Sequence, residues 1–190
     1  MTIATAGHST RSAEDLIVLL HAHGVRWIAD VRTVPRSRRN PQFARETLAA
    51  SLASAGIGYS HLPGLGGLRH PRKDSRNTGW QNASFRGYAD YMETGGFREA
   101  LAGLIDLARR VGGDAAEEAT AEDEARLCLL CAEAVPWRCH RSLIADALTV
   151  RGIAVVHILS LGPPRPHEIT PFAVIEGLDI SYPGLGLDRT

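Results

Sequence analysis

A strand, a helix and a second strand follow one another at the start of the chain, and this order restricts how the rest can fold. Ile3–Ala6 has the apolar pattern of a short strand. Ser12 is a suitable N-cap for a helix that begins with acidic residues and ends at Gly24, and Val25–Val31 has the pattern of a second strand. Two strands joined by one helix pair in parallel with a right-handed crossover. The first thirty residues therefore predict a parallel sheet.

The remaining sequence continues this alternation of strands and helices. Further strands are predicted at 57–62, 126–131 and 153–159, and helices at 45–55, from 85 past 110 with a break at Gly95–Gly96, and in the segment that ends at Gly152. The predicted fold class is α/β: a single three-layer domain with a mainly parallel sheet. We expect residues 1–160 to form this domain, with an acidic insertion at 112–124, and residues 161–190 to form a proline-rich arm packed on it.

Bulk properties favour a cytoplasmic protein. No apolar run approaches the roughly 20 residues that span a bilayer, and the first residues lack the pattern of a secretory signal. The three cysteines are an odd number, and two of them, Cys128 and Cys131, lie in a predicted buried strand. This use of cysteine is typical of reduced thiols rather than of a disulfide framework. No membrane partner is expected, and the oligomeric state is left open.

The net charge is zero, but the basic residues are concentrated in one segment. From Arg32 to Arg86 the chain has ten basic and two acidic residues, a net charge of +8. All but one of the 21 basic residues are arginine, whose planar guanidinium suits phosphate and carboxylate groups. A GC-rich genome explains the preference for arginine but not the clustering. The clustering favours an anionic ligand, which we expect to be a nucleotide or single-stranded nucleic acid.

The segment Cys131–Arg141 joins a buried strand to a helix and contains several reactive side chains. We expect its helix to begin near Pro136, which suits a first helical turn. A helix start and the flanking arginines would lower the pKa of Cys139 and make it a nucleophile, whereas the alternative is that Cys139 packs in the core. Glu133, two residues beyond Cys131, is expected on the same side of the strand, as an acid–base group or as an ion-pair partner.

Polar residues follow four of the predicted strands. Because the carboxyl ends of parallel strands meet at one edge of a sheet, we expect them to line one crevice. These residues are His8, Asp30 with Arg32, His61, and Glu133 with Cys139, His140 and Arg141.

A zinc site is an alternative use of Cys128, Cys131, Cys139 and His140. Two cysteines three residues apart in a strand point to opposite faces, and adjacent helical residues diverge by about 100°. These arguments count against a structural zinc site. A catalytic metal held by His8, His61 or His140 with Glu133 is a further alternative, but it has no spacing signature. No metal ligand is therefore assigned, and the cofactor is left open.

Four short motifs in order resemble the DUF488 family. They are Gly7-His8-Ser9-Thr10, then Asp30-Val31-Arg32 with Pro35-x-Ser37-Arg38 and Pro41-x-Phe43, then Leu65-Gly66-Gly67, and finally Cys131-x-Glu133 with Cys139-His140-Arg141. The resemblance covers roughly residues 3–158. Members are small bacterial and archaeal proteins of uncharacterised function, so the resemblance implies an α/β fold and a single site but no reaction.

These patterns favour an enzyme, a hydrolase or transferase, over a non-catalytic nucleotide- or nucleic-acid-binding protein or a His/Glu metal-binding enzyme. A pure phosphate binder needs only arginines and amides, whereas this chain adds a thiol, carboxylates and imidazoles. The expected catalytic residues are Cys139, Glu133, His140, Asp30 and His8. The expected substrate-binding residues are Arg32, Ser37, Arg38, Arg69 and Arg141.

Overall fold

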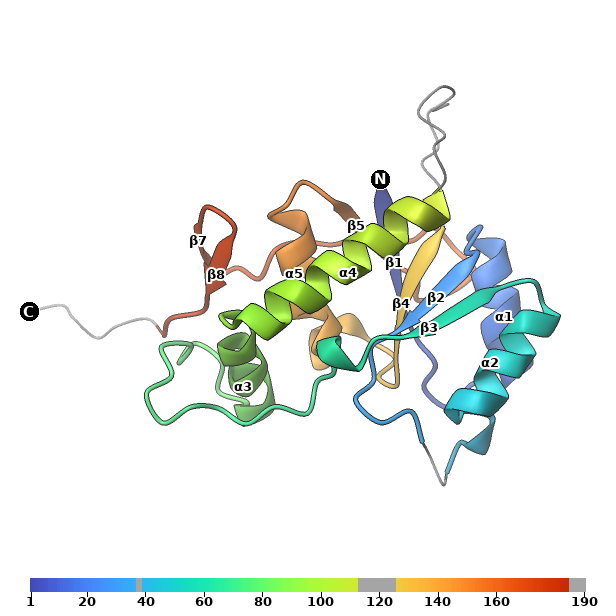
Figure 1. Ribbon diagram of the computed structural model, residues 1–190, viewed down its shortest axis with the longest axis horizontal. Coiled ribbons are helices and arrows are strands. Elements are labelled where there is room, and N and C mark those ends of the chain that lie inside the picture. Colours follow the sequence, from blue (N-terminus) through green and yellow to red (C-terminus); the bar gives the residue numbers. More distant parts are fainter. Residues whose placement is uncertain (37–38, 113–125, 185–190) are drawn as a thin grey trace, which may run out of the picture.

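The computed structural model describes residues 1–36, 39–112 and 126–184 (Figure 1). Its main sheet has six strands in the order β3-β2-β4-β1-β5-β6, and all pair in parallel except the short β6 at one edge. The strands are β1 Thr2–Gly7, β2 Trp27–Asp30, β3 Gly58–His61, β4 Leu127–Cys131, β5 Ala154–His157 and β6 Arg165–Pro166. The fold class predicted from the sequence is therefore confirmed.

The described part of the chain has five α-helices. They are α1 Ala13–Ala22, α2 Arg45–Ser54, α3 Ala83–Met92, α4 Gly95–Gly112 and α5 Arg141–Thr149. Helices α1, α2, α4 and α5 cover the two faces of the sheet, while α3 packs beside the start of α4 (Figure 1). Helices α1 and α2 share a core with one face of the sheet, and α3, α4 and α5 share a core with the other. None of the described helices has the length and apolar character that crossing a membrane requires.

Strand β4 lies between β2 and β1 and alternates strictly between the two cores. Leu127, Leu129 and Cys131 pack toward α4 and α5, whereas Cys128 and Leu130 pack toward α1 and α2. This alternation is the ordinary two-residue period of a strand. It sends the side chain of Cys131, at the carboxyl end of β4, toward the face that carries α5.

The helix that the sequence placed near Pro136 begins five residues later. Pro136–Arg138 forms a separate 3-10 turn, and Cys139 then adopts an extended backbone with φ −138° and ψ 140°. His140 is the N-cap of α5, and its carbonyl accepts the first α-helical hydrogen bond, from the amide of Ile144 at 3.2 Å. Its C-terminal end is as predicted, with Gly152 at φ +74°, a conformation that favours glycine.

The segment that follows β5 returns over α5 and contains the hairpin of β7 Val174–Glu176 and β8 Asp179–Ser181. It is anchored to the fully buried carboxylate of Asp146 on α5. His167 Nε2 lies 2.8 Å from this carboxylate, the Tyr182 hydroxyl donates to it at 2.8 Å, and the backbone amide and hydroxyl of Thr170 donate to it as well. The acidic insertion lies almost wholly outside the described residues.

Candidate functional site

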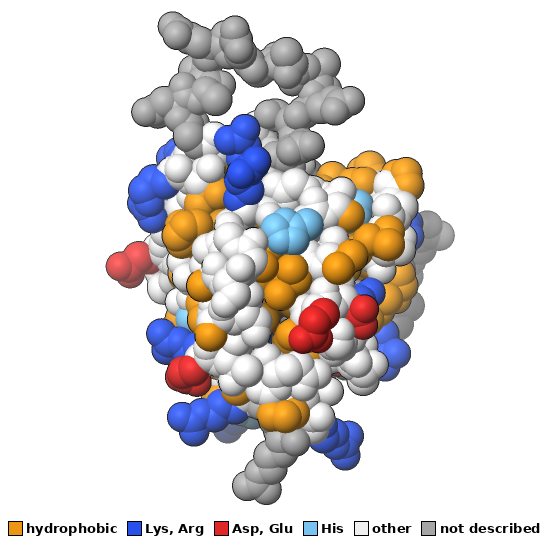
Figure 2. Space-filling model, turned by 90° about the vertical axis from the view of Figure 1, so that its right-hand side faces the viewer, with side chains coloured by type: hydrophobic (Ala, Val, Ile, Leu, Met, Phe, Trp, Pro, Cys, Tyr) orange, Lys and Arg blue, Asp and Glu red, His pale blue; other side chains and the backbone are white. Residues whose placement is uncertain are grey.

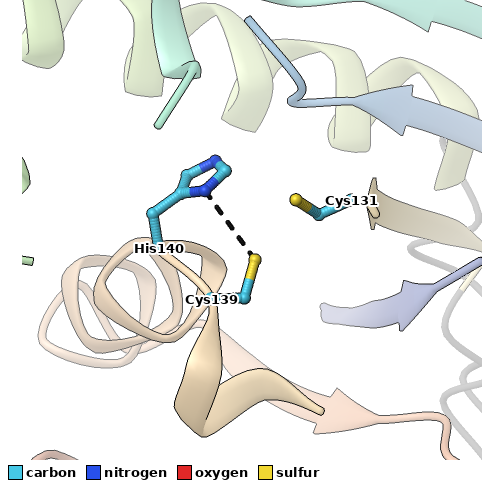
Figure 3. Close-up of side chains that lie close together, drawn as sticks. All are labelled: Cys131, Cys139 and His140. Carbon is cyan, nitrogen blue, oxygen red and sulfur yellow. Dashed lines mark hydrogen bonds between the residues drawn. The ribbon is translucent and has the colours of Figure 1, made fainter. Parts of the chain in front are cut away.

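Two thiols and one imidazole meet where β4 ends and α5 begins. Cys131 is the last residue of β4, and Cys139 and His140 immediately precede α5. The sulfur atoms and a ring nitrogen all lie within 4.8 Å of one another, and Figure 3 shows the three side chains directed toward a common space. We call these three residues the thiol cluster. The expectation that Cys139 and His140 diverge was wrong because neither lies inside the helix.

The imidazole of His140 is held in a defined orientation. Its Nε2 lies 3.1 Å from the carbonyl oxygen of Val31, so Nε2–H donates there and Nδ1 faces Cys139 Sγ at 3.7 Å. The ring centroid is 5.0 Å from that of Tyr88. On another side Gly67 approaches so closely that a Cβ atom there would lie 2.3 Å from Nδ1. Gly67, the last residue of the Leu65-Gly66-Gly67 motif, therefore packs directly against the imidazole of the thiol cluster.

The two thiols of the cluster differ in acidity. A hydrogen bond from Cys139, together with the nearby His140 and the charge of Arg141, lowers the pKa of Cys131. The pKa of Cys139 is raised, because it keeps the proton that the two sulfurs share and because it is buried. One of the two interpretations of the sequence expected a lowered pKa for Cys139. The Arg141 amide at the start of α5 acts in that direction, but the hydrogen bond with Cys131 and burial outweigh it. Burial in the opposite core raises the pKa of Cys128 to about 12.

Arg141 is fully buried, and no carboxylate of the described residues lies within ion-pair distance of it. Its guanidinium donates to the backbone carbonyls of Glu133 and, at 2.8 Å, of Ala134, while its Nε has no hydrogen-bond partner in the part of the chain that the structure describes. These bonds fix the loop that joins Cys131 to Cys139. A buried cation without an acidic partner costs free energy unless an anion lies close by. The thiol cluster is the nearby group able to supply negative charge.

Asp30 and Arg32, at the end of β2, form a buried ion pair. Arg32 Nε donates to Asp30 Oδ1 at 2.8 Å, a second guanidinium nitrogen donates to Oδ2, and the hydroxyl of Tyr59 donates to Oδ2 at 2.7 Å. Burial and the carboxylate raise the pKa of Tyr59, so its hydroxyl stays protonated. Both carboxylate oxygens are occupied. The pair therefore shapes the loop after β2.

His8 belongs to the same network. Its Nδ1 lies 2.9 Å from the carbonyl of Ser9, its Nε2 lies 3.3 Å from the Arg32 guanidinium, and its ring stacks on Phe43 with centroids 4.0 Å apart. Burial, with the positive charge of Arg32, lowers the pKa of His8. His8 and Glu133 lie at the same sheet edge, because the His8 amide donates to the Cys131 carbonyl at 3.0 Å.

The other predicted site residues are spread around this edge. Glu133 is exposed just beyond the end of β4, so it does not share a strand face with Cys131, and its carboxylate has no hydrogen-bond partner among the described residues. Arg69 stacks on Tyr91 at 3.6 Å and donates to two backbone carbonyls. His61 lines a hollow of about 720 Å³ beside β3. Ser37 and Arg38 lie outside the described residues.

The thiol cluster lies at the topological switch point of the sheet. The connection from β1 to β2 runs through α1, on one face of the sheet. The connection from β4 to β5 runs through α5, on the opposite face, and it leads toward the opposite edge of the sheet. Ligands of open α/β sheets bind at such a point. Sequence reasoning left Cys131 out of the site. The two-residue period of a strand could have indicated that Cys131 belongs to the site, because it places Cys131 on the same face as Leu129, which is the face that carries α5.

Comparison with known proteins supports one assignment. The family model described as "Domain of unknown function DUF488" matches residues 12–148, which include β2, all of α5 but its last residue, and the whole thiol cluster. A search of curated proteins and a search of solved structures gave no match.

Proposed function

The chain belongs to the DUF488 family, and we propose that it is an enzyme whose reaction centre is the thiol cluster and whose substrate carries phosphate. The observation that carries this proposal is the meeting of two thiols and an oriented imidazole at the switch point of the sheet. A structural core has no need of three such groups around one space. Reactive cysteines are found beside cations and at the ends of helices, as this cluster is.

The buried guanidinium of Arg141 is the reason for proposing an anionic substrate. It holds the loop of the cluster by its hydrogen bonds to two carbonyls, and no carboxylate of residues 1–36, 39–112 or 126–184 forms an ion pair with it. Negative charge that develops or binds at the cluster is stabilised by this fixed cation in a site with little water. Arg32, in contrast, is already paired with Asp30, so we assign it to the support of the site.

Exposed arginines at the same edge would hold the phosphate groups. Arg36 and Arg39 lie in the loop after β2, and Arg138 lies in the loop after β4; all three are exposed, and none has an acidic partner among the described residues. Trp137, beside Arg138, is 57% exposed and offers a surface on which a base can stack. Figure 2 shows that the basic side chains of the described residues lie toward the margins of the face formed by α1 and α2. The loops at the carboxyl edge are therefore the better surface for a nucleotide or a single strand.

Glu133 is the acid–base group that best fits this arrangement. Its carboxylate is exposed and unpaired among the described residues, two positions after Cys131. The carboxylate of Asp30, with its oxygens occupied by Arg32 and Tyr59, is not free to exchange a proton with substrate. We therefore assign the proton transfer to Glu133 and the reacting centre to the thiol cluster, with Cys139 as one member of it.

Binding of a fluorescent single-stranded oligonucleotide tests the substrate class. We expect affinity that falls steeply with salt and that is weakened by Arg138→Gln and by Trp137→Ala. Arg109→Gln, at an exposed position on α4, is the matched control and should bind as the unmodified chain does.

Catalysis is tested on a panel of nucleotides and phosphodiesters. Turnover that survives Cys128→Ser and is lost in Cys131→Ser supports the enzyme. Binding that is unaffected by Cys131→Ser, with no turnover of any member of the panel, favours a non-catalytic nucleotide-binding protein. Absence of both binding and turnover would remove the proposal.

A further inference from the structure

The spacing of the three groups in the thiol cluster matches that of ligands around one metal ion. Zinc binds thiolate sulfur at about 2.3 Å and imidazole nitrogen at about 2.0 Å, so in a tetrahedral site the sulfur and the nitrogen lie about 3.5 Å apart. Cys139 Sγ and His140 Nδ1 are 3.7 Å apart, and all three ligand atoms lie within 4.8 Å of one another. Shifts of well under 1 Å in each side chain would bring them to bonding distance.

The surroundings of His140 also have the form of a metal site. A ligating histidine usually donates its second ring N–H to a carbonyl or a carboxylate, which fixes the tautomer and leaves the first nitrogen free to bind. His140 meets this condition, because Nε2 lies 3.1 Å from the Val31 carbonyl and Nδ1 faces the sulfurs. Tyr88 and Gly67 pack against the ring on its other sides.

We propose that Cys131, Cys139 and His140 bind a thiophilic divalent cation, zinc in the first place, with a fourth position left open. This inference deepens the proposed function, since it places the cation at the same reaction centre. Structural zinc sites are closed by four protein ligands, whereas three ligands with an open position are typical of catalytic zinc. Among the described residues no fourth cysteine, histidine or carboxylate joins the group.

The charge of the site indicates what would occupy the fourth position. Two thiolates neutralise a divalent cation, and the buried guanidinium of Arg141 then leaves a net positive charge. An anionic oxygen is favoured there over a neutral ligand. A phosphate oxygen of the substrate or a hydroxide ion satisfies this requirement, and zinc is able to polarise the first or to generate the second at neutral pH.

Cobalt substitution tests the site. The full chain is freed of metal with a chelator and titrated with Co²⁺ under reducing conditions. We expect one ion per chain, thiolate-to-cobalt charge-transfer absorption and the visible bands of tetrahedral cobalt, all displaced by Zn²⁺. Cys131→Ser and Cys139→Ser should each weaken binding by about 100-fold or more, since even the loss of an outer-shell partner costs 10–100-fold. Cys128→Ser, in the opposite core, should bind as the unmodified chain does.

Thiol alkylation of the unmodified chain covers the case in which a cysteine variant does not fold. Zn²⁺ should protect Cys131 and Cys139 from alkylation. Absence of charge-transfer absorption together with absence of protection overturns the site, as does binding that Cys131→Ser leaves unchanged.

The oligonucleotide assay, repeated in chelator, separates the two proposals. Oligonucleotide binding without cobalt binding removes the metal but not the proposed substrate class. Cobalt binding without oligonucleotide binding or turnover removes the proposed function and leaves the metal site.

Discussion

Gly67→Ala tests the geometry of the thiol cluster without changing any of its ligands. A Cβ atom at this position would lie 2.3 Å from His140 Nδ1 and 2.6 Å from Cγ of the same ring. Ordinary contacts of a carbon atom begin near 3.5 Å, so the ring has to move by about 1 Å. The backbone of Gly67 does not have a positive φ, so alanine itself is not strained there. The substitution therefore acts through the imidazole.

A displacement of this size is large compared with the tolerance of a metal–ligand bond, which is about 0.2 Å. The nitrogen of His140 is then lost as a ligand, and its hydrogen bond to Val31 is disturbed as well. We expect the affinity for zinc to fall by about 10–100-fold. The free energy of unfolding should fall by only about 1–3 kcal/mol, the usual cost of overpacking, because the ring lies at the margin of the core.

Competition against a zinc-binding indicator dye measures the affinity, and urea denaturation of the metal-free chain measures the stability. Gly103→Ala is the matched control. It lies inside α4, and no atom of the described residues lies within 4 Å of the added Cβ, so the change should leave zinc affinity unchanged and stabilise the helix by up to about 1 kcal/mol. A folded Gly67→Ala chain that binds zinc as tightly as the unmodified one would refute the role of His140 as a ligand.

Three further predictions concern the framework of the site. Asp146→Asn should lower the free energy of unfolding, measured in urea, by about 2–4 kcal/mol, because an amide cannot accept all four hydrogen bonds that the buried carboxylate accepts. The control is Asp106→Asn at an exposed position, which should change the free energy of unfolding by less than about 0.5 kcal/mol. Burial lowers the pKa of His157 to about 4, so between pH 6.5 and pH 4 the unfolded chain binds a proton on this residue that the folded chain does not bind. The free energy of unfolding should therefore fall by roughly 2–3 kcal/mol over this range, and by less in His157→Gln. Gly7→Ala should prevent folding to a soluble chain in expression trials, since its Cβ would overlap the Glu133 carbonyl.

The fold was predictable because its signals are local. The strand–helix–strand order of the first thirty residues requires a parallel pair, and the glycines that end α1 and α5 adopt the positive φ expected of them. Apolar runs such as Leu127–Cys131 are typical of strands buried on both faces. Each of these inferences uses only residues close together in the chain, where the physics of the backbone decides the outcome.

The site was predictable only in part, because its geometry depends on contacts between distant segments. Pro136 is compatible with the first turn of either a 3-10 helix or an α-helix, and nothing local reveals that the backbone becomes extended at Cys139. That single extended residue turns Cys139 and His140 toward Cys131, eight residues earlier. The position of the imidazole also depends on Val31 and Gly67, which lie more than seventy residues away in sequence.

Helix α5 connects the thiol cluster to the C-terminal segment of the chain. Its first residue, Arg141, fixes the loop between the two thiols, and Asp146, more than one turn later, holds His167, Thr170 and Tyr182. A hydrogen-bonded chain continues from His167 through His157 to Thr5 on β1. Since α5 has only nine residues, its start has little freedom to move while its middle is held. The C-terminal segment, although remote from the thiols in sequence, therefore helps to fix their positions.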